Sequence, residues 1–228
     1  MTISPRELPP EIELGPFVRG VAHEVANPLN AVMMNVGLAK MLYDRGDMTR
    51  VGEVLERLGG DCTRFEKMLR GLQRFAAGLR APQRDRTAAA TLFGNAVELL
   101  AQPKPPLQVD AGEVDVHADN RALERAIAGI LQNSVEAGAQ TIQASARCDG
   151  ADVVLTIADD GEGISAASRE RAVEPFYSTR HSAGSAGLGL TLAREVMRAH
   201  GGTLAIEANQ PRGVCVTLHL PGAASAPD

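Results

Sequence analysis

The sequence predicts a chain of two unlike parts: an antiparallel helical hairpin, followed by an α/β sandwich with a mixed sheet and helices on one face. Apolar residues keep a helical spacing from about residue 16 to residue 79, and a segment rich in charge, glycine and proline interrupts this spacing near residue 80. Short segments of alternating polarity, mixed with helical ones, follow after that break. A chain of 228 residues is long enough to bury more than one core.

The composition excludes several classes of protein. It is ordinary for a soluble globular chain, with 44% hydrophobic and 22% charged residues, and the net charge of -5 argues against a nucleic-acid partner. Cys62, Cys148 and Cys215 are odd in number and widely spaced, which favours reduced thiols over a disulfide framework or a zinc site. No apolar run approaches the roughly 20 residues of a membrane helix. We therefore expect a cytoplasmic chain without a membrane segment.

The hairpin is expected over residues 15–80, after an N-terminal extension at 1–14. Gly46 ends the first helix, and either Asp47 or Thr49 caps the second. The apolar seam of the two helices is Val18, Ala22, Val25, Leu29, Val32, Val36, Ala39 and Tyr43, then Val51, Leu55, Leu58, Cys62, Phe65, Leu69, Leu72, Ala76 and Leu79. One hairpin cannot cover both stripes, so we expect two copies to pair into a dimeric four-helix bundle. A tetrameric or purely structural coiled coil stays open on the stripes alone.

The second half is expected to hold a linker at 81–87, the α/β sandwich at 88–221 and a disordered tail at 222–228. Its helical patterns cover residues 90–101, 119–138 and 189–202. Its strand patterns cover residues 107–111, 114–118, 140–148, 152–159, 203–208 and 214–220. Asp119 or Asn120 caps the second of these helices, and Gly138 follows its end.

The stretch "VAHEVANPLN", residues 21–30, places a histidine on the first helix. His23 falls between two seam positions and should face outward, although a lone histidine beside a glutamate is usually only surface. Asn27 occupies the place of the second histidine in H-E-x-x-H, which excludes a metalloprotease. Pro28 has no N–H, so the carbonyl of Glu24 loses its helical partner and a kink is expected.

Two motifs of the second half suit a nucleotide. In "IADDGEGIS", residues 157–165, an expected strand ends in aspartates followed by Gly161 and Gly163. An aspartate can accept from the exocyclic amine of adenine, and glycines let the backbone approach the base, although a plain strand–turn connection fits equally well. In "ILQNSVEAG", Asn133 is either a solvated polar residue or an amide oxygen ligand for Mg²⁺.

The stretch "EPFYSTRHSAGSAGLGLTLA", residues 174–193, combines an arginine with a glycine-rich loop. Arg180 can meet a phosphate with its planar guanidinium. Gly184, Gly187 and Gly189 lead into the start of a helix, which is an arrangement that binds anions. A single glycine loop of this kind is weak evidence when it stands alone.

Together the motifs resemble the histidine protein kinases of two-component signalling. "HEVANPLN" is similar to the phosphoacceptor box, "ILQNSVEA" to the asparagine box, "DDGEG" to the first glycine box, "EPFYSTR" to the phenylalanine box and "GLGL" to the second glycine box. The resemblance covers residues 16–221, and it departs from the family where Ser185 and Ala186 occupy the first two places of G-T-G-L-G-L. It implies a dimerisation and histidine-phosphotransfer hairpin followed by an ATP-binding domain of the gyrase, chaperone and kinase type.

The resemblance assigns roles on the hairpin. His23 would take the γ-phosphoryl group of ATP, and Glu24 would accept the proton of its other ring nitrogen. Asn27 would orient water for dephosphorylating the regulator, and Pro28 would let the helix bend between the two activities.

The resemblance also assigns the nucleotide site. Asn133 would hold Mg²⁺, and Asp159 would receive the adenine amine. The remaining binding residues are Gly161, Gly163, Phe176, Arg180, Gly187, Leu188 and Gly189.

The implied function is an ATP-dependent protein histidine kinase that transfers its phosphoryl group to an aspartate of a response-regulator receiver domain and also dephosphorylates that regulator. Its expected partners are a second copy of the chain, the regulator and a separate sensor or input protein. The alternative is a histidine phosphotransfer adapter with a degenerate ATP domain. An ATPase of the same superfamily that phosphorylates serine is a third class, and the histidine-bearing hairpin argues against it.

Overall fold

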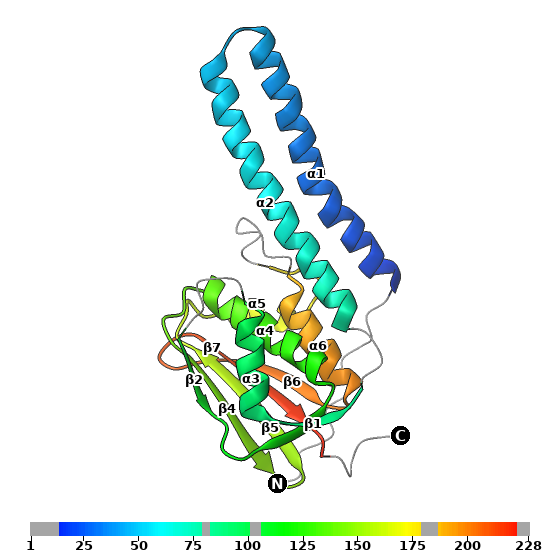
Figure 1. The fold of residues 1–228 in the computed structure, drawn as a ribbon, viewed down its shortest axis with the longest axis vertical. Helices are drawn as coiled ribbons and strands as arrows, with labels where there is room; N and C mark the ends of the chain where they lie inside the picture. The colour runs from blue at the N-terminus through cyan, green and yellow to red at the C-terminus, as the bar shows by residue number, and fades with distance from the viewer. Residues whose placement is uncertain (1–13, 79–82, 101–105, 179–186, 223–228) are drawn as a thin grey trace.

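The computed structural model describes residues 14–78, 83–100, 106–178 and 187–222. A long helical hairpin, α1 (Leu14–Asp44) and α2 (Met48–Gly78), stands on an α/β part formed by residues 83–222 (Figure 1). The expected N-terminal extension up to residue 13, and the expected tail from residue 223 on, lie outside the described residues. Within the described ranges, none of the helices has the length and apolar character needed to cross a membrane.

The two helices of the hairpin run antiparallel and pack along their length. Gly46 ends the first helix with a φ of +75°, as expected from the sequence. Asp47, rather than Thr49, caps α2, because its side chain accepts from the backbone N–H of Arg50 at 3.2 Å. α1 continues through Pro28, so the proline does not end the helix.

The contact between α1 and α2 is centred beside the predicted apolar seam, and about every second seam member is half-buried at its border. α2 buries Val54, Asp61, Met68 and Phe75, which recur every seven residues, one position before predicted seam members. The seam itself stays largely open to solvent, and its exposed members include Val18, Leu29, Val36, Tyr43, Leu55 and Leu69. The stripe that joins the two helices escaped the sequence analysis because it contains polar residues.

Asp61 is the clearest polar member of that internal stripe. Its carboxylate accepts from Asn35 Nδ2 on α1 at 2.8 Å and from the guanidinium of Arg64 on its own helix. Asp61 is buried, so these donors compensate for the water that it loses. The exposed members of the predicted seam, in contrast, have no cover within one chain.

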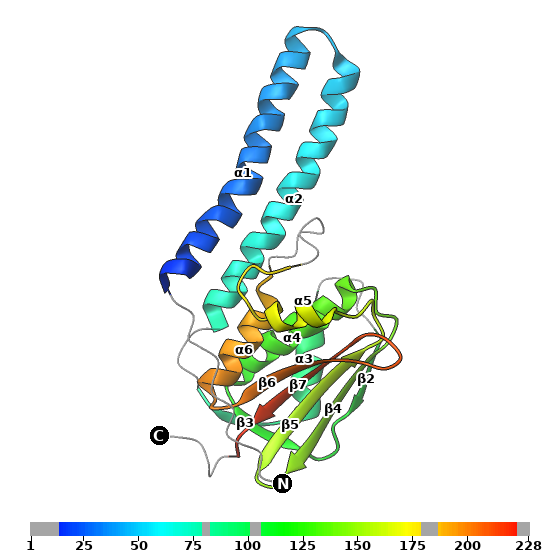
Figure 2. The same cartoon turned by 180° about the vertical axis from the view of Figure 1, so that it is seen from behind.

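The α/β part holds a five-stranded mixed sheet in the order β2-β4-β5-β7-β6. β2 and β4 are parallel and all other neighbours are antiparallel, so the expected mixed sheet is present. Helices α3, α4 and α6 lie on one face of this sheet (Figures 1 and 2). The elements are α3 (Ala89–Glu98), β2 (Leu107–Asp110), β3 (Asp115–Ala118), α4 (Asn120–Glu136), β4 (Ile142–Asp149), β5 (Asp152–Asp159), α5 (Ala166–Arg171), α6 (Gly189–Ala199), β6 (Thr203–Ala208) and β7 (Val214–Leu220).

The core lies between these helices and the sheet. α4 buries Leu123, Ile127 and Leu131 at the helical spacing of one face. β5 is the central strand and is buried at five of its eight positions, whereas β4 alternates at its start. Asp119 caps α4 by accepting from the backbone N–H of Ala122 at 2.9 Å.

Two elements differ from the sequence expectation. Asp85–Ala88, most of which was assigned to the linker, forms strand β1 and pairs antiparallel with β3. A short helix, α5, occupies a segment where no helix was expected, and Ser165 caps it. Both elements have only four to six residues, and β1 depends on a partner strand far along the chain, so neither has a local periodicity to reveal it.

Aromatic side chains join the base of the hairpin to the α/β part. The ring of Phe17 on α1 stacks on Phe75 of α2 at 5.1 Å and on Phe176 of the α/β part at 5.4 Å between ring centroids. Phe75 is buried with the core of the α/β part. Gly20 lies against the Phe176 ring so closely that a Cβ there would be 2.7 Å from a ring carbon.

Candidate active site

A pocket opens between α4 and the first turn of α6, above the ends of strands β5, β6 and β7. Asn133 and Ser134 contribute from α4, and Asp159 contributes from the end of β5. Apolar walls and a few polar groups are typical of a small-molecule site. The lining residues are Ile130, Asn133, Ser134, Glu136, Ala137, Asp159, Gly163, Ile164, Ser168, Ala172, Tyr177, Ser178, Gly187, Gly189, Leu190, Ile206, Val214 and Val216.

Asp159 is the most constrained polar group in this pocket. Its Oδ1 accepts from the backbone N–H groups of Gly161 and Val214 at 3.0 and 3.1 Å. Its Oδ2 accepts from the hydroxyl of Ser134 at 2.7 Å. The residue is buried, so these donors replace water and fix the direction of the carboxylate.

Asp160, next to Asp159 in the sequence, binds a turn and not the pocket. Its carboxylate accepts from the backbone N–H of Gln140 at 2.7 Å and from both the backbone and the hydroxyl of Thr141 at 3.0 and 2.8 Å. The backbone hydrogen bond from Thr141 is the main cause that holds the pKa of Asp160 below its ordinary value. Asp160 therefore fastens the turn before β4, and only Asp159 faces the pocket.

Glycines allow the close packing around Asp159. A Cβ on Gly161 would lie 2.8 Å from the Cβ of Ala137 and 3.1 Å from Asp159 Oδ1. Gly163 has a φ of +83°, which other residues rarely adopt. Gly213 has a φ of +110°, and a Cβ there would overlap the carbonyl oxygen of Asp159. The sequence analysis selected Gly161 and Gly163 but missed Gly213.

The start of α6 forms the other end of the pocket. Gly129 of α4 faces Gly189, where a Cβ would be 3.2 Å from the Cα of Gly189. A Cβ on Gly189 would in turn lie 3.5 Å from both terminal atoms of Asn133. These two glycines let the helices approach closely, and they bring the Asn133 amide beside the first turn of α6.

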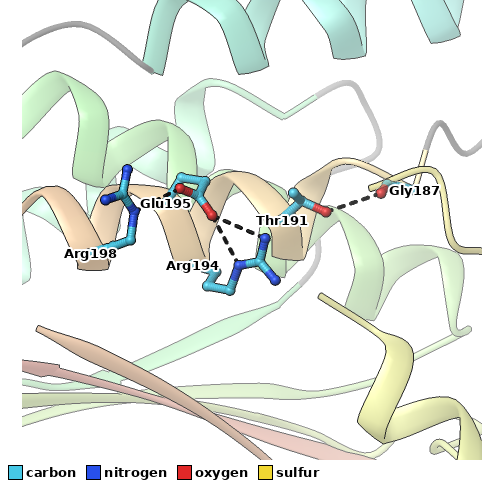
Figure 3. A network of polar contacts seen from close by, with 5 residues as sticks. All are labelled: Gly187, Thr191, Arg194, Glu195 and Arg198. Carbon is cyan, nitrogen blue, oxygen red and sulfur yellow. Dashed lines mark hydrogen bonds and ion pairs between the residues drawn. The ribbon is translucent and has the colours of Figure 1, made fainter. Parts of the chain in front are cut away.

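Gly187 and Phe176 hold the loop before α6. The Phe176 backbone N–H donates to the Gly187 carbonyl at 3.1 Å, and Thr191 Oγ1 donates to the same carbonyl at 3.4 Å (Figure 3). Gly187 has a φ of +61°, and a Cβ there would meet the backbone of Phe176 and Tyr177 at 2.6 Å. Phe176 itself has a φ of +65°, which is unusual for a side chain of this size.

A buried ion network fixes the middle of α6. Glu195 is buried, and the guanidinium groups of Arg194 and Arg198 each lie 3.0 Å from its carboxylate (Figure 3). Paired in this way, the charge is tolerated inside the protein. These three residues lie on α6 itself, beyond the first turn that lines the pocket.

Leu188, Gly161 and Phe176, which were also predicted to bind the nucleotide, are not lining residues of the pocket. Leu188 is buried in the hydrophobic core, and Gly161 stands behind Asp159. Phe176 contributes its backbone to the loop and its ring to the contact with Phe17. Arg180, with Gly184, Ser185 and Ala186, lies outside the described residues.

The predicted hairpin residues are close to one another but are not lining residues of the pocket. His23 and Asn27 are exposed and one helical turn apart on α1, while Glu24 is half-buried. The helix touches the α/β part through Gly20, which is three residues before His23 and meets the Phe176 ring. Phe176 thus contacts both α1 and the loop at Gly187.

Sequence reasoning missed the residues that support Asp159. Ser134, Gly213 and Val214 contact this residue from positions 25 or more residues away along the chain. Asn209 also supports it, because its Nδ2 donates to the Asp159 carbonyl at 2.8 Å. The one available signal was the position of Ser134 directly after Asn133 on a predicted helix.

The chain is similar in sequence to known proteins. Residues 118–224 match the family described as "Histidine kinase-, DNA gyrase B-, and HSP90-like ATPase". Alginate biosynthesis sensor protein KinB of Pseudomonas aeruginosa is 27% identical over 220 residues, which cover 90% of this chain and 36% of KinB. Sensor histidine kinase ZraS of Escherichia coli O157:H7 is 27% identical over 223 residues, which cover 92% of this chain and 46% of ZraS.

The chain thus spans less than half the length of these two relatives. Among solved structures, Acinetobacter baumannii histidine kinase AdeS superposes with a TM-score of 0.64 at 17% identity. The superposition covers 88% of this chain and 98% of the AdeS chain, so it includes the hairpin as well as the α/β part. At this identity the likeness concerns the fold alone.

Proposed function

We propose that this chain, as a member of the two-component sensor histidine kinases, is an ATP-dependent protein histidine kinase. It phosphorylates its own His23 and passes the phosphoryl group to an aspartate of a response-regulator receiver domain. One observation carries the proposal: the buried carboxylate of Asp159 is oriented by three donors into a pocket that ends at the first turn of α6.

The pocket has the chemistry that ATP needs at both of its ends. Ile206 and Val216 offer apolar surface to a purine ring, and Asp159 offers an acceptor to its 6-amino group. At the other end, α6 begins without a side-chain cap at Leu188, and Gly189 lines the pocket. Backbone N–H groups at such a helix start, together with the helix dipole, attract a phosphate chain.

Asn133 suits a magnesium ion that accompanies the nucleotide. Its amide supplies a hard oxygen ligand, and the absence of a side chain on Gly189 leaves space beside it. Magnesium would neutralise charge on the phosphate oxygens during transfer. Arg180 and the loop before Gly187 complete the proposed phosphate site.

The chemical step is an in-line displacement at the γ-phosphorus of ATP. One ring nitrogen of His23 forms the new N–P bond, while the bond to the bridging oxygen breaks and ADP leaves with its electron pair. Glu24 accepts the proton from the other ring nitrogen, which neutralises the imidazolium as it forms. An aspartate carboxylate of the regulator then attacks the same phosphorus, and the N–P bond breaks while Glu24 returns its proton to the ring, which restores neutral His23.

The transfer requires a change of arrangement between the hairpin and the α/β part. His23 is exposed on α1 and is not among the residues that line the pocket, so the phosphate end of the pocket must approach α1. Pro28 is one turn beyond His23, where the helix lacks one backbone hydrogen bond and bends more easily. We assign the switch between phosphorylation and dephosphorylation of the regulator to this bend.

The active form proposed here is a homodimer. The predicted seam along α1 and α2 is largely exposed, including Leu29, Val36 and Leu55. A second copy of the hairpin supplies the same stripe and can cover it in a four-helix bundle. The regulator and a separate input protein are the further partners that this function requires.

The adapter is the second candidate, because an adapter needs only His23. It would place no demand on Asn133 or Asp159. The three donors that orient Asp159 favour the kinase, since an adapter gains nothing from a fixed acceptor in a pocket.

Incubation of the purified chain with γ-labelled ATP and magnesium tests the proposal. A kinase acquires an acid-labile label that is lost in both His23→Ala and Asp159→Asn. Label accepted only from a phosphorylated regulator, and retained in Asp159→Asn, identifies the adapter. An acid-stable label, or label that persists in His23→Ala, excludes both.

A further inference from the structure

Ser134 is a buried hydroxyl in the pocket whose role the proposed function does not state. Its side chain is 2% exposed, and its Oγ lies 2.7 Å from Asp159 Oδ2 and 3.4 Å from the carbonyl oxygen of Ile130. Both neighbours are hydrogen-bond acceptors. The single hydroxyl proton therefore points to one of them, and the nearer, charged carboxylate forms the stronger bond.

The surroundings of Asp159 leave little freedom in this arrangement. Oδ1 is occupied by the two backbone N–H groups of Gly161 and Val214. Oδ2 receives the Ser134 proton on one lone pair and keeps another for a ligand. Ser134 and Asp159 both line the pocket, so a ligand here meets two neighbouring oxygens, neither of which has a proton to give.

We propose that Ser134 determines the purine specificity of the pocket: its hydroxyl admits a 6-amino purine and rejects a 6-oxo purine. This inference rests on the proposed binding of ATP. It concerns a residue beyond those assigned to the nucleotide by the motifs, and it identifies the 6-substituent as the group on which the choice depends.

The physical reason is the number of protons available beside Asp159. An amino group carries two N–H donors and is satisfied by acceptors, whereas an oxo group is itself an acceptor and faces two others. Ser134 can turn its proton to an oxo group only by giving up its bond to a carboxylate. A water molecule in the same place has two protons, and it can donate to Asp159 and to an oxo group at once.

Ser134→Ala tests this difference, because it opens a hydroxyl-sized space on the pocket wall that water can enter. Alanine is the best helix former, so α4 should be preserved. Calorimetric titration of the full chain with ATP and with inosine triphosphate, each with magnesium, gives two dissociation constants. We expect the preference for ATP over inosine triphosphate to fall about tenfold, since one hydrogen bond corresponds to roughly this factor.

Ser145→Ala is the matched control. Ser145 is a half-buried serine on β4, opposite Thr156, and it is not a lining residue of the pocket. Both dissociation constants should stay as in the wild type. Thermal unfolding of each variant checks that the fold is preserved.

The outcomes separate this inference from the proposed function. If the wild type prefers ATP and Ser134→Ala keeps the same preference, the role of Ser134 is wrong while ATP binding stands. An equal weakening of both nucleotides identifies a merely structural serine and also overturns the inference. If the wild type binds neither nucleotide, the proposed function itself is wrong.

Discussion

Asp159 and Asp160 adjoin each other in the sequence and have opposite tasks in the structure. Asp159 ends β5 and receives one donor from nearby Gly161 and two from distant parts of the chain, whereas Asp160 holds the turn at Gln140 and Thr141. At the scale of single residues, function therefore depends on which donors reach each side chain. Single substitutions that add or remove one side-chain group should therefore change ATP binding, stability or activity.

Gly213→Ala should abolish ATP binding and lower the free energy of unfolding by about 3 kcal/mol or more. A Cβ at Gly213 would overlap the Asp159 carbonyl oxygen, and its φ of +110° disfavours any side chain. Gly150→Ala is the control, because Gly150 has a φ of +65° with open space around it and should cost only about 1 kcal/mol. Urea denaturation and ATP titration measure both effects, and equal losses in the two variants would contradict the prediction.

His200 should make the fold sensitive to mild acid. Its Nε2 accepts from the backbone N–H of Asp119 at 2.8 Å, and its Nδ1 lies 2.7 Å from the Val196 carbonyl, so the neutral ring fits both contacts. Burial is the main cause that lowers the pKa of His200 below its ordinary value of 6.5. The unfolded chain then binds this proton more readily than the folded chain does.

The free energy of unfolding should therefore fall as the pH drops below about 6.5, where the unfolded chain begins to bind the proton. The stabilisation by neutral His200 is fully lost once the pH has fallen below the lowered pKa of His200 in the folded chain. Denaturation of His200→Gln at several pH values should show a weaker dependence between pH 7 and about pH 5. His23→Gln, at an exposed histidine of α1 that is not among the groups acting on His200, should keep the dependence of the wild type. Unchanged pH dependence in His200→Gln would assign it to other groups.

Asn27→Ala should leave autophosphorylation of His23 within about twofold and reduce dephosphorylation of the regulator at least tenfold. Asn27 is exposed one turn from His23, where its amide can orient water toward a phosphoryl group on the regulator. The assays are label on His23 and loss of label from the phosphorylated regulator. A parallel loss of both activities would remove the special role of Asn27.

At the scale of elements, α1 touches the α/β part through a contact that also reaches the pocket. Phe17 stacks on Phe176, and the backbone of Phe176 binds Gly187 at the start of the α6 loop. Gly20 permits this contact because it has no side chain between α1 and the Phe176 ring. A change in packing at the base of the hairpin should therefore shift Phe176 and, through it, Gly187, which lines the pocket.

Gly20→Ala should separate α1 from Phe176, because the new Cβ would lie 2.7 Å from a ring carbon. Gly37→Ala, on the same helix with nothing within 4 Å of its Cβ, should only stabilise α1, by up to about 1 kcal/mol. Hydrogen exchange of the backbone amides of Phe176 and Tyr177 measures the contact. Faster exchange is expected in Gly20→Ala alone, and the same exchange in both variants would show that this contact does not hold the segment.

At the scale of the whole molecule, the hairpin presents two apolar stripes and buries one. The internal stripe joins α1 to α2 through Leu42, Val54, Met68 and Phe75. The other, which includes Leu29 and Val36, remains open within one chain. An exposed apolar stripe of this length is typical of an interface between proteins. A second copy of the hairpin has the same stripe and can pack against it.

Val36→Glu should weaken dimerisation at least tenfold, because it places a charge in the open stripe. Met34→Glu is the matched control: Met34 is 75% exposed against 52% for Val36, but it lies on another side of α1. Light scattering across a dilution series gives the mass of each variant. Equal weakening by both substitutions, or by neither, would contradict pairing through this stripe.

Most helices and strands could be predicted from the sequence, because periodicity, caps and glycine stops are local. Asp119, Gly46 and Gly138 mark ends of elements where they were expected, and the alternating segments form the strands of the mixed sheet. The chemistry-bearing residue types, including Asn133, Asp159 and the glycines of the pocket, were also readable from motif spacing.

The partners that these elements and residues contact became known from the three-dimensional fold. It selected the stripe that contains Asp61 for the contact inside the hairpin, paired β1 with β3, and joined Ser134 and Gly213 to Asp159. Each of these contacts links positions many residues apart. A local pattern predicts whether a residue faces the core or the solvent, but it does not predict which distant residue will pack against it. These pairings therefore appear only in the folded chain.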